Sequence, residues 1–278
     1  GGSRVQHLQG EGGFGIFTLM EEAVITLENT AILAAPIDPE LERMMKAGVH
    51  LGHAKTKDHP SMKRHIFGVR NTISVIDLVQ TKDALRSAKE FLSDVVSRGG
   101  LVLLVGTRPA ARAFILDVAG KTGMPYFIER WIGGALTNFK VISKRVEYMM
   151  QLEHDKKSGA LEKYTKKERL GKDEELARLV RMFDGLRSMK RLPNAVFIVD
   201  TTYDDTAVNE ARRMKVPIVA LCDTNANAAV ISHPIPSNDD ALPALRYMIG
   251  EIGIAIEQGL KDKQTAAENI PPVAGQQV

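Results

Sequence analysis

Cysteine is nearly absent from this sequence. The chain has one thiol, Cys222, which excludes an internal disulfide and a cysteine-rich zinc site. No apolar run reaches the length that spans a membrane, and the first residues lack the positive start and apolar core of a secretory signal. These absences predict a cytoplasmic protein without a membrane partner.

An overall excess of either sign of charge is also nearly absent, because the formal net charge is only +3 in 278 residues. The positive charge is nevertheless concentrated in one stretch. Residues 46–70 contain six Lys or Arg against a single acid, Asp58, with four histidines interleaved. Asn71 ends this basic segment just before an apolar run.

Apolar runs alternate with helical patterns along most of the chain. The run LVLLVG at 101–106 has no polar interruption, which is typical of a strand buried on both faces of a parallel sheet. Other strands are predicted at 73–78, 126–129, 195–200 and 217–222, with an edge segment near Ile231. Helices are predicted at 81–98, 107–122, 204–214 and 239–258, with Thr81 and Thr107 at two of their starts. This alternation predicts a Rossmann-like doubly wound parallel sheet of the α/β class, in three αβα layers.

Residues 137–191 interrupt that alternation. Apolar side chains recur at helical spacing in two stretches of about twenty residues, with dense mixed charge around them. Thr137 is placed to cap the first stretch. We therefore expect an inserted antiparallel helical hairpin. The predicted domains are a discontinuous core at 38–136 and 192–260, the hairpin at 137–191, an N-terminal extension at 1–37 and a disordered tail at 261–278.

The segment RWIGGALTNFK, residues 130–140, contains the only tryptophan beside a glycine pair. Gly133 and Gly134 lie between a predicted strand and a predicted helix, where exposed amides suit a phosphate. In one interpretation Trp131 stacks on a base or sugar; in the other it fills the core and the glycines only make the turn. The nearby polar candidates are Arg130, Asn138, Lys140, Lys144 and Arg145.

His50 and His53, in GVHLGH, have a spacing that permits shared metal coordination on a helical turn. The sequence identifies no further ligands. Hydrogen bonding to backbone or phosphate fits better beside Lys55, Lys57, Lys63 and Arg64, and a structural role in the core is a third interpretation. We therefore predict no metal site.

An enzyme acting on a nucleotide or sugar phosphate is the main competing hypothesis. The turn after LVLLV has one glycine, Gly106, instead of a dinucleotide fingerprint, and no Walker loop occurs. Carboxylates do follow predicted strands, at Asp200, Asp204, Asp205 and Asp223. Because no nucleophile or histidine accompanies them at a fixed spacing, we interpret them as caps and turn formers. No catalytic residue, cofactor or small-molecule substrate is predicted.

Several motifs together resemble a known family. They occur in order: GVHLGH, PSMKRHIF, VIDL, VGT, RWIGGALTNFK, MKRLPNAVFIVD, EARRMKVPIVAL, DTN and PIPSNDDA. From about Leu41 to Gly259 the chain resembles the second protein of the bacterial small ribosomal subunit. Matching motifs in a matching order make chance an improbable explanation.

The resemblance implies a non-catalytic ribosomal component in the cytoplasm. Members bind 16S rRNA where the head and body of the subunit meet, and they help to dock the large mRNA-binding first protein. It also implies that cations and exposed glycine backbone on one flank face RNA. The implied RNA-binding residues are His50, His53, Lys55, Lys57, Lys63, Arg64, Arg70, Asn71, Arg130, Trp131, Gly133, Gly134, Asn138, Lys140, Lys144 and Arg145. A nucleotide enzyme and a free-standing interaction scaffold are the alternatives.

Overall fold

The computed structural model describes residues 38–268, so the predictions for 1–37 and 269–278 lie outside the described residues. The chain divides into two compact units, Gly1–Glu42 and Arg43–Val278. The architecture below is that of the second unit. The first unit is described only over residues 38–42, where helix α2 (Pro39–Lys46) begins. Among the described helices, none is both long and apolar enough to cross a membrane.

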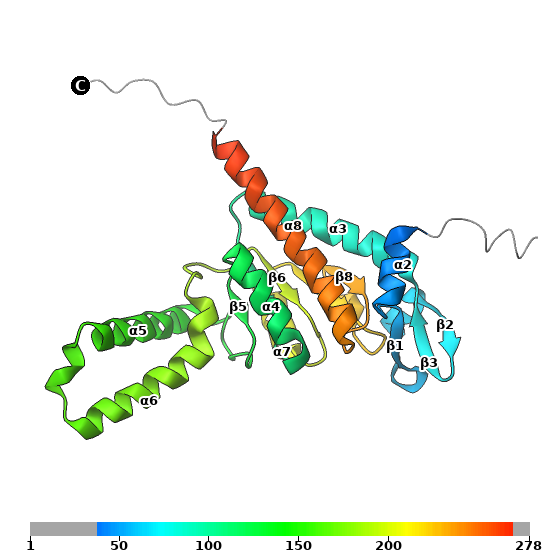
Figure 1. Cartoon of the computed structure of the whole chain (residues 1–278). Coiled ribbons are helices and arrows are strands. Elements are labelled where there is room, and N and C mark those ends of the chain that lie inside the picture. Colours follow the sequence, from blue (N-terminus) through cyan, green and yellow to red (C-terminus); the bar gives the residue numbers. More distant parts are fainter. Residues whose placement is uncertain (1–37, 269–278) are drawn as a thin grey trace, which may run out of the picture. The chain divides into compact units, whose positions relative to one another are not determined.

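A parallel five-stranded sheet forms the centre of the second unit (Figure 1). Its strand order is β5-β4-β6-β7-β8, and all four neighbouring pairs are parallel. This confirms the predicted sheet. The edge strand β8 contains Pro234 and Pro236. An edge strand tolerates proline because it has a neighbour on one side only and so needs fewer backbone N–H donors. The bounds are β4 (Val102–Val105), β5 (Tyr126–Phe127), β6 (Ala195–Ile198), β7 (Ile218–Cys222) and β8 (His233–Pro236).

Helices cover both faces of this sheet, so it is the middle layer. Alternate strand residues such as Leu103, Val105 and Ile198 join a buried cluster with side chains of α5, α6 and α7. The intervening residues, such as Leu104 and Phe197, are also buried and point to the other face, because side chains alternate along a strand. Helices α3 and α4 each contact α8. Their bounds are α3 (Leu78–Ser97), α4 (Pro109–Thr122), α7 (Asp205–Arg213) and α8 (Leu242–Glu268).

Two long helices, α5 (Phe139–Lys157) and α6 (Lys166–Phe183), lie between β5 and β6 in the chain and contact each other (Figure 1). The buried side chains of each helix recur at helical spacing and join the buried cluster of the sheet. Short 3₁₀ turns, Ala160–Lys163 and Asp184–Leu186, flank α6. Thr165 and Glu168 form a capping box that fixes where α6 begins.

A second, three-stranded antiparallel sheet corrects the prediction for residues 73–78. That strand, β3, does not belong to the parallel sheet; it pairs with two strands that the sequence analysis missed. The turn between the last two strands has φ of 49° at Asn71 and 68° at Thr72, as a two-residue type I′ hairpin requires. The bounds are β1 (Leu51–Ala54), β2 (Ile66–Arg70) and β3 (Ile73–Ile76), with 3₁₀ turns at Lys55–Lys57 and Pro60–His65.

Several helix ends differ from the prediction. Helix α3 is capped by Asp77, which accepts from the Val79 amide at 2.9 Å, while Thr81 lies inside the helix. Arg108, and not Thr107, precedes α4, and Asn138, not Thr137, precedes α5. Helix α8 continues to Glu268, so the tail predicted to be disordered from residue 261 begins with helix.

Candidate nucleic-acid interface

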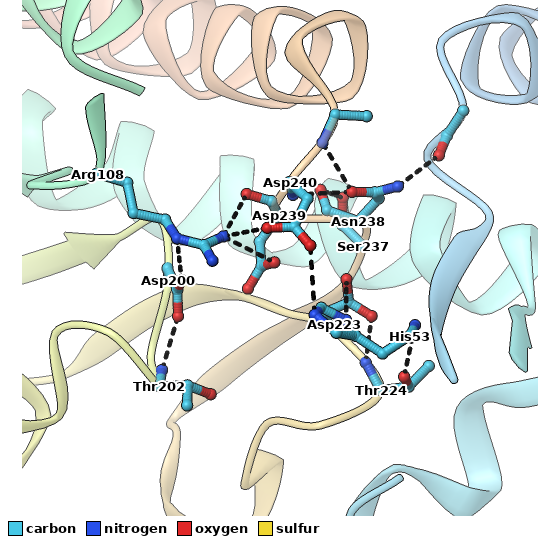
Figure 2. A network of polar contacts seen from close by, with 12 residues as sticks. His53, Arg108, Asp200, Thr202, Asp223, Thr224, Ser237, Asn238, Asp239 and Asp240 are labelled. Atoms are coloured by element: carbon cyan, nitrogen blue, oxygen red, sulfur yellow. Dashed lines mark hydrogen bonds and ion pairs between the residues drawn. The ribbon is translucent and has the colours of Figure 1, made fainter. Parts of the chain in front are cut away.

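Polar side chains gather at the carboxyl ends of the parallel strands (Figure 2). Arg108, just after β4, donates from Nε to Asp200 Oδ2, just after β6, at 2.9 Å. The strand order makes the gap between β4 and β6 the switch point, where doubly wound proteins bind phosphate-bearing ligands. In this chain an ion pair joins the two sides of that position. Arg108 also pairs with Asp239 and Asp240.

Buried carboxylates make the same region unfavourable for an anion. Asp204 accepts from the Thr107 hydroxyl at 2.7 Å, and burial raises the Asp204 pKa to about 6. Burial also raises the pKa of Asp239, with the charges of Asp200 and Asp223 adding to the effect. A phosphate placed here would meet further negative charge. The site therefore lacks the electrostatics of a nucleotide enzyme.

The predicted capping role of the strand-end acids is supported at Asp200 and Asp223. Asp200 accepts from the amides of Thr202 and Tyr203, both at 2.8 Å, and so forms the turn after β6. Asp223 accepts from the amide of Thr224. These contacts are those of turn formers. Asp200 and Asp223 also hold Arg108 and His53, a role that the sequence did not reveal.

His53 and His50 have different surroundings. His53 lies in β1, with Nδ1 3.1 Å from Asp223 Oδ2 and Nε2 3.3 Å from Asp240 Oδ2. The hydrogen bond to Asp223 is the main reason that the His53 pKa is raised, against the effect of burial. Burial lowers the pKa of His50, whose Nδ1 has no hydrogen-bond partner within residues 38–268. The partners of His53 are therefore carboxylates, whereas we predicted hydrogen bonds to backbone or phosphate.

Shared metal coordination by the two histidines is not supported, because His50 precedes β1 and is not in the group of possible ligands that contains His53. His53 instead has possible co-ligands that the sequence analysis missed. One ligand atom each from His53, Asp223, Asp239 and Asp240 lies within 4.8 Å of the others. One imidazole nitrogen with carboxylate oxygens is a donor set that can bind zinc. The prediction of no metal site thus overlooked a group that could hold a divalent cation.

The basic segment lies against this cluster and is firmly held. The His59 amide donates to the Thr224 carbonyl at 2.7 Å, and the Lys55 amide donates to the Thr72 carbonyl at 2.9 Å. Its lysine and arginine side chains between residues 55 and 70 are exposed, and in residues 38–268 they form no ion pair. A fixed backbone with free cations suits a phosphate backbone. The exposed members are Lys55, Lys57, Lys63, Arg64, Arg70 and Asn71.

The loop after β5 is organised by a carboxylate that sequence reasoning missed. Glu210 of α7 accepts from the amide of Gly134 at 2.7 Å and from the amides of Leu136 and Thr137 at 3.1 Å. It also accepts from Trp131 Nε1 at 3.1 Å. Gly134 is one of the two glycines whose amides we predicted for a phosphate, and its amide already has the Glu210 carboxylate as its acceptor. The only sequence signal is an acid in the motif EARRMKVPIVAL.

Trp131 is 7% exposed, and its ring centroid lies 4.8 Å from that of Phe127. Of the two interpretations of this tryptophan, the structure supports the core one. The other members of this group are exposed and, among the described residues, form no ion pair. They are Arg130, Gly133, Asn138, Lys140, Lys144 and Arg145.

The two groups of cations lie toward opposite edges of the five-stranded sheet. The Arg130 loop follows β5, which is one edge of the five-stranded sheet. The basic segment instead contacts Thr224, which follows β7 near the opposite edge. Any RNA that meets both groups must therefore reach across the carboxyl ends of the strands or arrive as two separate helices.

An exposed apolar face lies next to the basic segment. Phe67 is 82% exposed, and Val69, two residues along β2, is 47% exposed. With Leu51 and Ile73 they line a cavity of about 560 Å³ on the three-stranded sheet. Exposed apolar groups that lie together mark an interaction site. The alternation of Phe67 and Val69 was the available sequence signal, and it was missed because the segment was read for its charge.

These features define the class: a Rossmann-like α/β protein whose switch point holds ion pairs and whose free cations face outward, as in a binding protein. The comparisons agree. A family model described as ribosomal protein S2 matches residues 44–259. This chain belongs to the ribosomal protein S2 family.

Relatives of this family cover most of the chain, and each is named small ribosomal subunit protein uS2. The protein of Mycobacterium leprae is 41% identical over 221 residues, which is 80% of each chain. That of Acidothermus cellulolyticus is 41% identical over 244 residues, 86% of this chain and 89% of the relative. That of Dehalococcoides mccartyi is 41% identical over 216 residues, 78% and 88% of the two chains.

Proposed function

We propose that this chain is a structural component of the small ribosomal subunit that binds 16S rRNA where the head and body of the subunit meet. Its family is structural and not enzymatic, and the uS2 relatives carry the subunit in their name. The single observation that carries the proposal is this family match over residues 44–259. A position on the ribosome follows, which in bacteria is a cytoplasmic particle.

Electrostatics support the RNA-binding part of the proposal. Lys55, Lys57, Lys63 and Arg64 are exposed and form no ion pair among residues 38–268. Free cations on a rigid backbone bind phosphates through release of condensed counterions. Folded RNA would be recognised by its shape, since a deep, narrow major groove hides its base edges.

The proposal includes a protein partner, the large mRNA-binding first protein of the subunit. The apolar face around Phe67 supports this part. A phosphate backbone cannot bury the side chains of Phe67, Val69 and Ile73 favourably, whereas an apolar protein segment can. We therefore assign this face to protein docking and the adjoining cations to RNA.

Co-sedimentation tests the proposed function. A tagged copy of the chain, expressed in a bacterium, should run with the small subunit in a sucrose gradient at moderate magnesium and salt. Recovery of the chain only at the top of the gradient would contradict the proposal. Tight binding of a nucleotide by that free fraction would favour the enzyme alternative instead.

A further inference from the structure

A cavity of about 320 Å³ lies between the loop after β5 and helix α6. Glu129, Arg130, Ile132 and Gly133 contribute from the loop, and Arg178, Arg181 and Met182 contribute from the helix. Its volume is within the range of about 300–1,000 Å³ typical of ligand-sized pockets. The cavity lies outside the strand-end cluster and the basic segment.

The charge of this cavity is positive. Both oxygens of Glu129 are already engaged: Oε1 accepts from Arg112 at 3.1 Å, and Oε2 accepts from Nε and Nη2 of Arg181 at 3.2 and 3.0 Å. Arg130 and Arg178 are exposed and have no ion pair within the described part of the chain. Two guanidinium groups are thus free to bind an anion at the rim.

The backbone at Gly133 is open to a partner. A Cβ atom built on this glycine would meet no atom of the described residues within 4 Å, so none of them covers that part of the loop. The neighbouring Gly134 differs, because its amide donates to Glu210 and its φ is +85°. Glu210 therefore acts as a positioning residue: it fixes the loop in a shape that presents Gly133 beside the two arginines.

The remaining wall is apolar. Ile132 is half-buried, and Met182 is 42% exposed despite its size. Methionine is flexible and polarisable, and it adapts to flat rings. A planar arginine fork matches the oxygens of a phosphate and also stacks on bases. A positive rim with an apolar wall thus fits one nucleotide, with the phosphate outside and the base inside.

We infer that this cavity receives a single unstacked nucleotide of the ribosomal RNA. Its phosphate lies against Arg130, Arg178 and the backbone of Gly133, and its base lies against Ile132 and Met182. The inference rests on the proposed function and adds a specific contact to it. An acidic protein segment would use the arginines but would leave the apolar wall unexplained.

A photo-crosslink tests the contact. Met182→p-benzoylphenylalanine is introduced into the full chain, small subunits are purified and irradiated, and the crosslinked RNA is mapped by reverse-transcription stops. We expect one strong stop in 16S rRNA. The matched control is the same replacement at Leu116 of α4, which is 41% exposed and should give no stop there. A crosslink from position 182 to a protein, or none from an incorporated chain, would overturn the inference.

A charge reversal gives a second readout. Arg178→Glu should weaken incorporation into small subunits by about tenfold and abolish the position-182 crosslink. Arg169→Glu makes the same charge change on the same helix, at an exposed residue outside the cavity, and should change incorporation much less. Equal effects of the two variants would overturn the inference. Failure of even the unaltered chain to enter subunits would instead reject the proposed function, and the inference with it.

Discussion

Glu210 of α7 accepts a hydrogen bond from the indole Nε1 of Trp131 at 3.1 Å, and the same carboxylate accepts from three backbone amides of the loop after β5. Four N–H donors therefore converge on one acid that is 9% exposed. The arrangement resembles an anion site in which the anion belongs to the protein. It explains how a glycine-rich loop keeps one shape before any partner binds.

This relationship predicts a pH-dependent stability. Burial raises the pKa of Glu210, but the hydrogen bonds from Thr137, Trp131, Gly134 and Leu136 outweigh it, so the folded-state pKa is lowered. The stabilisation is present above the unfolded-state pKa of about 4.3 and is lost as pH falls through the lowered folded value. Glu210→Gln should be less stable than the unaltered protein at pH 7, by about 2–3 kcal/mol, with a gap that narrows below pH 4. Urea denaturation at several pH values measures this; a constant gap would refute it.

Trp131 provides the second prediction. Because its ring is buried against Phe127, Trp131→Ala should lower the free energy of unfolding by about 3–5 kcal/mol. Trp131→Phe keeps an aromatic ring and should cost less, mainly the hydrogen bond to Glu210. Thermal unfolding compares the two variants. If Trp131→Phe folds normally but loses subunit binding, the ring contacts RNA and the core assignment is wrong.

Asp204 predicts a pH dependence of stability opposite in sign to that of Glu210. Its pKa is raised by burial to about 6 from 3.8, so the folded state favours the protonated acid. That contribution to stability is complete below pH 3.8 and disappears as pH rises through about 6. Asp204→Asn keeps an acceptor for Thr107 without the charge. Relative to the unaltered chain, it should gain about 2 kcal/mol between pH 4 and pH 8. Unfolding curves at both pH values measure the difference, and no relative gain would contradict the assignment.

A substitution at Phe67 tests protein docking independently of folding. Since its side chain is 82% exposed, Phe67→Ser should change the stability of the free protein by no more than about 0.5 kcal/mol. Subunits containing this variant should nevertheless lose the large mRNA-binding first protein, measured by its recovery in the gradient fractions. Leu116→Ser, at a 41% exposed residue of α4, is the control. Normal recovery with Phe67→Ser would move the docking site elsewhere.

The parallel sheet was predictable because a strand buried on both faces appears in the sequence as an uninterrupted apolar run. VLLV and AVFI are uninterrupted apolar runs, and both are fully buried strands in the structure. The three-stranded sheet was not predictable in the same way. Its strands are short, one of them includes Gly52, and Gly68 and Arg70 interrupt the next, so charge concealed the alternation of Phe67 and Val69.

The composition of the sequence predicted which cations of the candidate site are exposed. It did not predict which residues the buried side chains of the site contact. Exposed cations were identified as such because a cluster of lysines without acids has few ways to be buried. The partners of His53 and Trp131 are Asp223 and Glu210, which lie 170 and 79 residues away in sequence. Such pairings depend on the tertiary fold, and no local pattern reports them. The domain boundaries stay a prediction.

Salt-dependent binding of the basic segment is the most direct test that this chain faces RNA. The variant Lys55→Gln, Lys57→Gln, Lys63→Gln, Arg64→Gln is compared with a control that neutralises Lys166, Lys167, Lys261 and Lys263, which are also exposed. Affinity for subunits lacking the protein is measured from about 50 to 200 mM salt. Each lost phosphate contact should reduce the slope of log affinity against log salt by about 0.7–0.9, so we expect a reduction of about 3 for the first variant and little for the control. An unchanged slope, with full incorporation at every salt concentration, would contradict the RNA-facing assignment.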